Sequence, residues 1–464
     1  MRSSFLVLFA LFVFFVLLRT PASAAPSSLT YQFQEQIFTL GPKSFNGWQK
    51  VERHTFFRGV EVELPSGLLR SLPRSDIHEE TRITWNAEAI KATIEKDVAA
   101  KINREAGSVR IFRDTDGKIA FEGLGLPGRA LDVPLTVELT LKALAEGVSL
   151  IQLPIIETQP TVLIEDEELK SIGIRELVAA GESAFAGSPP NRRHNIGVGI
   201  QRFLGHLIPK GAEFSFNAVL GPVNAAAGYK KELTIKGERT EPDYGGGLCQ
   251  VSTTAFRGVW NAGFPITMRM NHSFAVRYYS PEGTDATAYP PYKDVRFLND
   301  GTSALLVQTA VIGDKAHFLY YGTKIPGRTA ELVGPYTWDL RAPPQDRIGY
   351  TTDIPVGAKR IVSQRVPGMK TIWYRIVKRE GTLEVIEPFY SAYETRPYFE
   401  EIGVLAGDPR LHAAATSEEE AVADLSGEDK WSETSASQNE ESTETSSKLQ
   451  GRPKWAEKPS SRRR

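Results

Sequence analysis

The sequence contains very little cysteine, because only one of its 464 residues, Cys249, is of this type. This excludes a disulfide-stapled scaffold and a multi-cysteine zinc site. The chain also lacks an excess of charge of one sign, since 55 Lys and Arg residues stand against 56 Asp and Glu residues. That balance argues against nucleic acid as a partner, because coating nucleic acid needs a basic excess. The seven histidines show no paired metal-ligand spacing, so we expect no metal and no other cofactor.

Long apolar runs are absent except near the N-terminus, where an uncharged and mostly apolar segment covers residues 5–18. Arg2 precedes this segment, and the small residues Ala22 and Ala24 follow it at signal-peptidase spacing. We predict a signal peptide at 1–24, cleaved near Ala24. An uncleaved anchor is the alternative, but 14 residues are short for a bilayer core of about 30 Å. The mature protein is then expected without a stable membrane span, in the periplasm, cell wall or extracellular space.

The mature sequence divides into four regions that differ in composition and hydrophobic pattern. They predict a multidomain α+β protein. Residues 26–165 indicate a small α+β domain, and residues 170–315 contain the motifs that suggest chemistry. Residues 330–405 read as strands and turns punctuated by glycine, which is typical of a thin antiparallel module. Residues 407–464 are rich in Ser, Thr, Glu and Lys and predict a disordered tail.

Periodicity assigns elements within the first of these regions. Apolar residues recur every four positions in 87–102, which predicts a helix. The Asp-Thr-Asp-Gly sequence at 114–117 predicts the turn of a hairpin. Apolar and polar residues alternate at 135–141, which predicts a strand, and 150–154 indicates another.

Cys249 directly follows three glycines, 245–247. Apolar residues at 248, 251, 255 and 259 share one helical face, so we predict a glycine turn leading into a helix whose first turn contains Cys249 and which Gly263 can end. Free N–H groups at a helix start stabilise a thiolate, and backbone N–H groups of a glycine turn can stabilise an oxyanion. We therefore predict that Cys249 is a nucleophile. The residues predicted to contact substrate around it are Gly246, Gly247, Ser252 and Thr253.

A thiolate that attacks an acyl group needs a base, and the base needs an orienting partner. His272 is the candidate base, on a segment whose alternation predicts a strand. Asp285 is the nearest candidate to orient it, and Asp294 is a second. Arg269 and Arg277 are the candidates to bind a substrate carboxylate.

Each of these residues also has a non-catalytic interpretation. Cys249 can be a small residue that packs in a tight space or pairs between molecules, and His272 can be a structural histidine. Asp285 can simply cap a turn. The residues by themselves leave these alternatives open.

The arrangement of motifs in roughly 180–310 resembles the VanW domain. An Arg-x-x-Asn element at 192–195 belongs to the same pattern. The preceding region is similar to the peptidoglycan-binding domain that often precedes VanW domains, and 330–405 is similar to a five-glycine extracellular module. The matching segments are 191–196, 211–217, 220–222, 228–229, 245–254, His272, 285–287 and 294–299.

The family takes its name from a vancomycin-resistance cluster, and the resemblance implies action on peptidoglycan. It implies a cysteine-dependent L,D-transpeptidase, an acyltransferase that forms 3-3 cross-links between stem peptides. Cys249 would be the nucleophile, His272 the base and Asp285 its orienting residue. Two alternatives stay open: a non-catalytic peptidoglycan-binding protein, and a thiol hydrolase that cuts stems.

Overall fold

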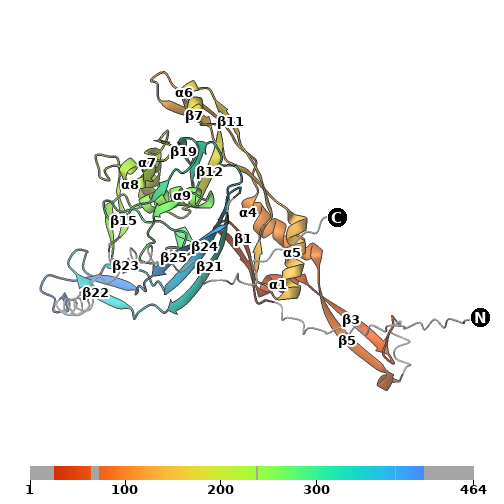
Figure 1. Cartoon of the computed structure of the whole chain (residues 1–464). Coiled ribbons are helices and arrows are strands. Elements are labelled where there is room, and N and C mark those ends of the chain that lie inside the picture. The colour runs from red at the N-terminus through yellow and green to blue at the C-terminus, as the bar shows by residue number, and fades with distance from the viewer. Residues whose placement is uncertain (1–25, 64–72, 237–238, 382, 412–464) are drawn as a thin grey trace, which may run out of the picture. The chain divides into compact units, whose positions relative to one another are not determined.

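The computed structural model of the chain describes residues 26–63, 73–236, 239–381 and 383–411. The predicted signal peptide and residues 412–464 of the predicted tail lie outside this range. The described residues form a mixture of helices and small sheets, which confirms the α+β prediction (Figure 1). None of the helices within them is both long and apolar enough to cross a membrane. The described residues form two compact units, one of residues up to Pro344 together with Arg365–Pro397, and one of Gln345–Gln364 together with the described residues from Tyr398 onward.

The first region has a small sheet of its own, covered by helices. Its central strand β1 pairs with β2 on one side and, in parallel, with β9 on the other, which confirms the strand predicted at 150–154. The helix predicted at 87–102 is also confirmed. It runs without a break, and its middle part is a π-helical turn between two α-helical parts. The Asn86 side chain caps its start by accepting from the backbone N–H groups of Glu88 and Ala89. The elements are β1 (Leu29–Phe33), β2 (Gln36–Leu40), β9 (Leu150–Gln152), α1 (Pro42–Trp48), α3 (Ala87–Ile94), η2 (Glu95–Ala99) and α4 (Ala100–Ile102).

The strand predicted at 135–141 is wrong, because these residues belong to helix α5 (Val133–Glu146). Asp132 caps the helix by accepting from the Leu135 N–H, and Gly147 ends it with a left-handed conformation. The buried face includes two threonines, Thr136 and Thr140, whose hydroxyls bond carbonyls four residues back. Polar residues on the buried face gave the sequence its misleading alternation.

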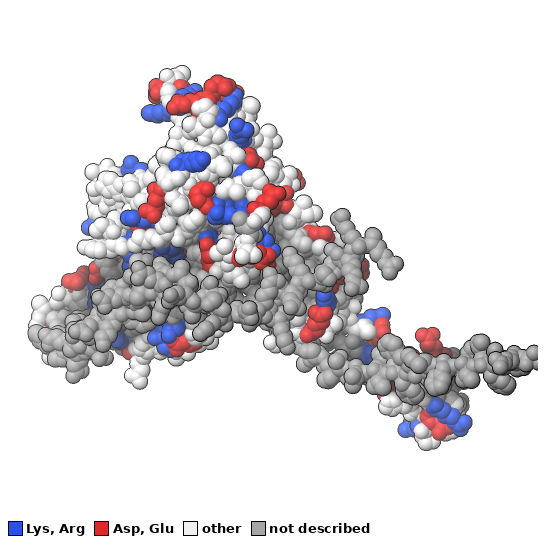
Figure 2. Space-filling view, in the orientation of Figure 1, with Lys and Arg blue, Asp and Glu red and all other residues white. Residues whose placement is uncertain are grey.

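The hairpin predicted around 114–117 is confirmed by β6 and β7, which pair across that turn. Arginines on β6 form ion pairs with carboxylates on neighbouring elements, such as Arg110 with Glu122 and Glu165. Figure 2 shows such mixing of positive and negative side chains across the visible face. The remaining elements of this region are β3 (Gln49–Phe57), β4 (Val60–Glu61), η1 (Arg74–Asp76), β5 (Ile77–Trp85), β6 (Ser108–Arg113), β7 (Ile119–Gly123), β8 (Gly128–Leu131), β10 (Ile155–Thr158), β11 (Thr161–Ile164) and α6 (Glu167–Ser171).

Helix α9 (Leu248–Asn261) packs against β12 and β20 of a four-stranded sheet in the order β12-β20-β19-β13 (Figure 1). The predicted apolar face of the helix is buried, but so are its polar residues, including Gln250 and Arg257. The sheet and surrounding elements are β12 (Glu176–Ala184), α7 (Pro190–Gln201), β13 (Leu207–Ile208), β14 (Glu213–Ser215), α8 (Phe216–Leu220), β15 (Lys231–Lys236), β16 (Arg239–Tyr244), β17 (Ile266–Met268), η3 (Arg277–Tyr279), β18 (Arg296–Leu298), β19 (Leu305–Ile312) and β20 (Lys315–Gly322).

The strands of the region predicted as one module at 330–405 divide between the two units. The sheet β21-β24-β25 belongs to the larger unit, where Trp373 packs edge-on against Trp260 of α9. The smaller unit contains the sheet β22-β26-β23, in which β22 and β26 run parallel. The predicted domain boundaries themselves stay predictions. The strands are β21 (Thr329–Arg341), β22 (Arg347–Thr351), β23 (Lys359–Ser363), β24 (Gly368–Lys378), β25 (Val385–Tyr393) and β26 (Phe399–Gly403).

Two glycines allow α9 to approach β12 closely, which generates a stability prediction. A Cβ at Gly181 would lie 2.1 Å from the Thr254 carbonyl oxygen and 2.7 Å from the Gly258 nitrogen, both backbone atoms. We therefore expect Gly181→Ala to lower the free energy of unfolding by at least about 1–3 kcal/mol. Gly197→Ala is the matched control, because this helical position of α7 opens onto free space. It should be neutral or stabilising by up to about 1 kcal/mol in urea unfolding. Equal effects of the two substitutions would contradict the packing argument.

Candidate active site

The turn before α9 needs glycine for two reasons. Gly245 and Gly247 have φ values of +81° and +111°, which residues with a side chain rarely adopt. A Cβ on Gly247 would also lie 3.0 Å from the Arg192 Cγ and 3.2 Å from the Ile196 Cγ1. The glycine turn therefore lets the start of α9 lie directly against α7, which brings Arg192 to the same place as Cys249.

Cys249 is the second residue of α9, as predicted, and its thiol is half-buried. It lines a cavity of ≈ 1030 Å³, and Gly247, His272 and Arg192 line the same cavity. The Sγ atom lies 3.7 Å from the Ala288 carbonyl oxygen. The cavity wall also includes the hairpin β15–β16 and two tyrosines, Tyr289 and Tyr292. The only cysteine of the chain is therefore open to a cavity that can hold a peptide-sized ligand.

His272 lies beside the thiol, in a loop rather than in the predicted strand, because β17 ends at Met268. Its Nδ1 is 2.6 Å from Asp285 Oδ2, and its backbone N–H donates to the same oxygen at 2.7 Å. Since Nδ1 is committed to Asp285, Nε2 is the ring nitrogen left for the Cys249 thiol, which lines the same cavity. The ring of Tyr279 stacks on the imidazole with centroids 4.6 Å apart. The structure thus brings the three residues predicted as nucleophile, base and orienter into one connected group.

The charges of this group favour a thiolate next to an imidazolium. Burial opposes the thiolate, but the nearby positive charge of His272 lowers the pKa of Cys249 overall. Burial likewise opposes protonation of the imidazole, but Cys249 and Asp285 raise the pKa of His272 to about 9. The pKa of Asp285 is far below its usual range despite burial, because His272 and Arg269 contact its carboxylate. Such a pair is the resting state of an activated cysteine nucleophile.

Asp294, the second candidate orienter, has a different role. Its carboxylate accepts from Ser215 Oγ at 2.6 Å, from the Asn217 N–H at 2.9 Å and from the Arg296 Nε at 2.8 Å. These bonds fix the start of α8 and its neighbouring strands. Geometry therefore selects Asp285 as the partner of His272.

Ser252 and Thr253 do not face the cavity, although the sequence suggested contact with substrate. Both are completely buried, and the Ser252 Oγ donates to the Ala286 carbonyl at 2.6 Å. The Thr253 Oγ1 accepts from the Ala286 N–H at 3.0 Å. Arg257 holds the same loop further along, donating to the Thr284 Oγ1 at 2.7 Å. These α9 side chains hold the loop that positions Asp285.

Neither arginine predicted to bind a substrate carboxylate lies at the cavity. The Arg269 side chain is buried and donates to the Asp285 backbone oxygen at 2.7 Å and to Ser391 Oγ at 2.7 Å, with its Nη2 3.2 Å from Asp285 Oδ1. Its charge is therefore used to hold Asp285. Arg277 is exposed, next to the Tyr278 ring and outside the cavity lining. Gly246 is also outside the lining and packs against Glu232.

Two residues of the site, Tyr279 and Tyr393, were not predicted from the sequence, and a third, Arg192, was predicted only as part of a motif. Tyr279 stacks on His272, and the Tyr393 hydroxyl donates to Asp285 Oδ1 at 2.5 Å. Tyr393 is more than 100 residues from its partner and carries no local signal. Arg192 belongs to the Arg-x-x-Asn element, where Asn195 donates to the Gly246 carbonyl at 3.0 Å and so helps fix the glycine turn.

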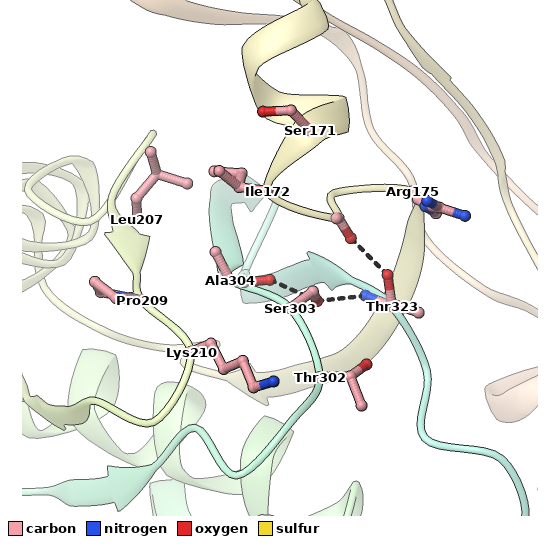
Figure 3. A pocket seen from close by; sticks show the side chains of 11 residues that line it. Ser171, Ile172, Arg175, Leu207, Pro209, Lys210, Thr302, Ser303, Ala304 and Thr323 are labelled. Carbon is pink, nitrogen blue, oxygen red and sulfur yellow. Dashed lines mark hydrogen bonds between the residues drawn. The ribbon is translucent and has the colours of Figure 1, made fainter.

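A second hollow of ≈ 690 Å³ lies between α6 and the ends of β13 and β20 (Figure 3). Two of its hydroxyls are bonded to the backbone: Thr323 Oγ1 donates to the Gly173 carbonyl at 2.7 Å and Ser303 Oγ donates to that of Ala304 at 2.9 Å. Lys210 supplies an amine, but the residues lining this hollow include no nucleophile paired with a base. Of the two hollows, the Cys249 cavity is therefore the candidate site.

Comparison with known proteins finds a match for the part of the chain that contains these residues. Residues 191–321 match the family model described as VanW like protein, a segment that includes Arg192, Cys249, His272 and Asp285. This part of the chain is a VanW-like domain. The chain is also 33% identical over 181 residues to the uncharacterized protein YoaR of Bacillus subtilis (strain 168), which is 39% of this chain and 58% of that relative. The chain thus spans less than two thirds of the relative's length. No solved structure matches.

The charge arrangement of the VanW-like domain predicts a reactive thiol at neutral pH. Because the pKa of Cys249 is lowered, alkylation by iodoacetamide should stay fast below pH 8 and slow only as the pH falls through the lowered pKa. His272→Gln removes the opposing charge and leaves burial, which raises the thiol pKa. The rate at pH 7 should then fall at least about tenfold. An unchanged pH profile in this variant, or a native thiol that reacts only after denaturation, would contradict the ion pair.

The two buried aspartates can be separated by matched substitutions. Asp285→Asn removes the negative charge that holds His272 protonated, so thiol alkylation at pH 7 should fall at least about tenfold. Asp294→Asn should lower the melting temperature by weakening the α8 cap, at a cost of about 1 kcal/mol, and leave the alkylation rate unchanged. Equal alkylation rates in the two variants would reject Asp285 as the orienting residue.

Proposed function

We propose that this protein is exported to the bacterial cell envelope and acts on peptidoglycan as a cysteine-dependent acyltransferase of the L,D-transpeptidase type. The observation that supports this most is the connected group of Cys249, His272 and Asp285 at a cavity of peptide size. The VanW-like domain points to the same cell-wall context. A residue that only filled space would not need a charged partner or an opening to a cavity.

The first half of the reaction forms a thioester. The Cys249 thiolate attacks the carbonyl carbon of a donor stem peptide, and the amide C–N bond breaks. Protonated His272 gives its Nε2 proton to the departing amine of the terminal D-residue. The backbone N–H group of Cys249 stabilises the oxyanion, because the neighbouring N–H groups of Leu248 and Gln250 already donate to the Gly245 and Gly247 carbonyls.

The second half transfers the acyl group to an acceptor stem. The acceptor amine attacks the thioester carbon, His272 takes the proton from this amine, and the C–S bond breaks to restore the thiolate. Asp285 keeps Nε2 directed at the sulfur through both halves. Water in place of the amine gives hydrolysis, so the acceptor decides between the two products.

Purified protein incubated with muropeptides tests this proposal. Wild type should form new cross-linked dimers, and Cys249→Ala and His272→Ala should each lower the rate at least about 1000-fold. Product formation should also decline above about pH 9, as His272 loses the proton needed by the leaving amine. Mass spectrometry of the products separates the alternatives: trimmed stems without dimers would indicate a hydrolase. Unchanged products with Cys249→Ala, or peptidoglycan binding without any product, would overturn the catalytic proposal.

A further inference from the structure

Arg192 combines three properties that set it apart in the VanW-like domain: it is charged, it is only 8% exposed and it lines the Cys249 cavity. No carboxylate forms an ion pair with its guanidinium in the described parts of the chain. A buried charge without a counter-charge is costly, and one that borders a cavity can obtain its counter-charge from a ligand.

The partners of Arg192 within the protein are all neutral. Its Nη1 donates to Ser188 Oγ at 2.6 Å, and its Nη2 donates to Gln250 Oε1 at 3.0 Å and to the Tyr279 hydroxyl at 3.4 Å. Its guanidinium lies over the Tyr278 ring, 4.1 Å from the centroid. Burial raises the pKa of Tyr279, so this phenol stays neutral at physiological pH. These contacts fix the position of the guanidinium without neutralising it.

Three of the five guanidinium N–H donors are used in these bonds, and no acceptor for the other two occurs among the described residues. Arg192 is also close enough to Cys249 for its charge to contribute to the lowered thiol pKa. The same Tyr279 ring that bonds Arg192 stacks on His272. The free donors therefore belong to a rigid group that includes the reacting atoms.

We propose that Arg192 binds the free carboxylate of the residue that leaves the donor stem, so that the site selects donors ending in an uncapped acid. This inference rests on the proposed reaction for the identity of the donor. In such a donor the terminal carboxylate is three bonds from the carbonyl carbon that Cys249 attacks. Binding it at Arg192 positions that carbon at the thiolate, and release of the terminal residue removes the counter-charge and frees the site.

The carboxylate site can be tested without turnover, by alkylating Cys249 with iodoacetate and with iodoacetamide. The two reagents form the same C–S bond and release iodide, but only iodoacetate carries a carboxylate. The ratio of their rates cancels any change in the thiol pKa, because both reagents react with the same thiolate. We expect Arg192→Gln to lower the iodoacetate to iodoacetamide ratio about tenfold or more, as the loss of a charged hydrogen bond predicts. Arg192→Lys should retain part of the preference.

Two further variants act as comparisons. Arg202→Gln removes an equal charge from the residue that ends the same helix, α7, and should leave the ratio within about twofold. Lys293→Gln removes another cation of the cavity lining. A fall of the ratio in Lys293→Gln but not in Arg192→Gln would overturn the proposal, as would an equal slowing of both reagents in Arg192→Gln.

The carboxylate site can also be tested on the wild-type protein alone, so that the result does not depend on whether a variant folds. Acetyl-L-lysyl-D-alanine should protect Cys249 from iodoacetamide at a concentration about tenfold lower than its C-terminal amide does. Equal protection by acid and amide would reject the carboxylate site. If the acid protects better but muropeptides give no product, the carboxylate site stands and the transpeptidase proposal fails.

Discussion

The buried carboxylate of Asp285 is the interaction on which the site depends. It is only 3% exposed, and it accepts from the His272 backbone and ring, from the Tyr393 hydroxyl and from Arg269. Burying a negative charge is costly unless such partners surround it. Their bonds bring together segments that are far apart in the chain, and they keep His272 in one tautomer and orientation.

Hydrogen bonds and close packing in the rest of the VanW-like domain hold this group in place. Helix α9 is buried on all sides, and side chains of its first three turns anchor the loop before and after Asp285. Glycines at its contacts with α7 and β12 allow backbone approaches that any side chain would prevent. Cys249 therefore lies on an almost wholly buried helix. His272 is bonded to Asp285, whose neighbours Thr284 and Ala286 are hydrogen-bonded to that helix.

Three buried arginines near the site have different partners, and these partners could not be predicted from the amino-acid sequence. Arg269 uses its charge on Asp285, Arg257 uses its donors on backbone carbonyls, and Arg192 has only neutral partners. Only Arg192 of these three lines the cavity. A guanidinium held in place but not neutralised is suited to bind an anionic group, and the proposal of a carboxylate site rests on this property.

Local sequence determined much of this protein: the mixed α+β class, the helix start at Cys249 and the hairpin around 114–117 all follow from glycine placement and periodicity. The sequence also pointed to His272 as the candidate base for Cys249, and the resemblance to the VanW domain implied the same role. Periodicity failed where buried polar residues replaced apolar ones, as with Thr136 and Thr140 in α5. Only the tertiary structure shows that Asp285 rather than Asp294 contacts His272, and that Tyr393 is bonded to Asp285. It also shows that Arg192 rather than Arg269 lines the cavity. The physical reason is that a charged side chain takes its role from the partners that burial forces on it, and those partners are distant in sequence.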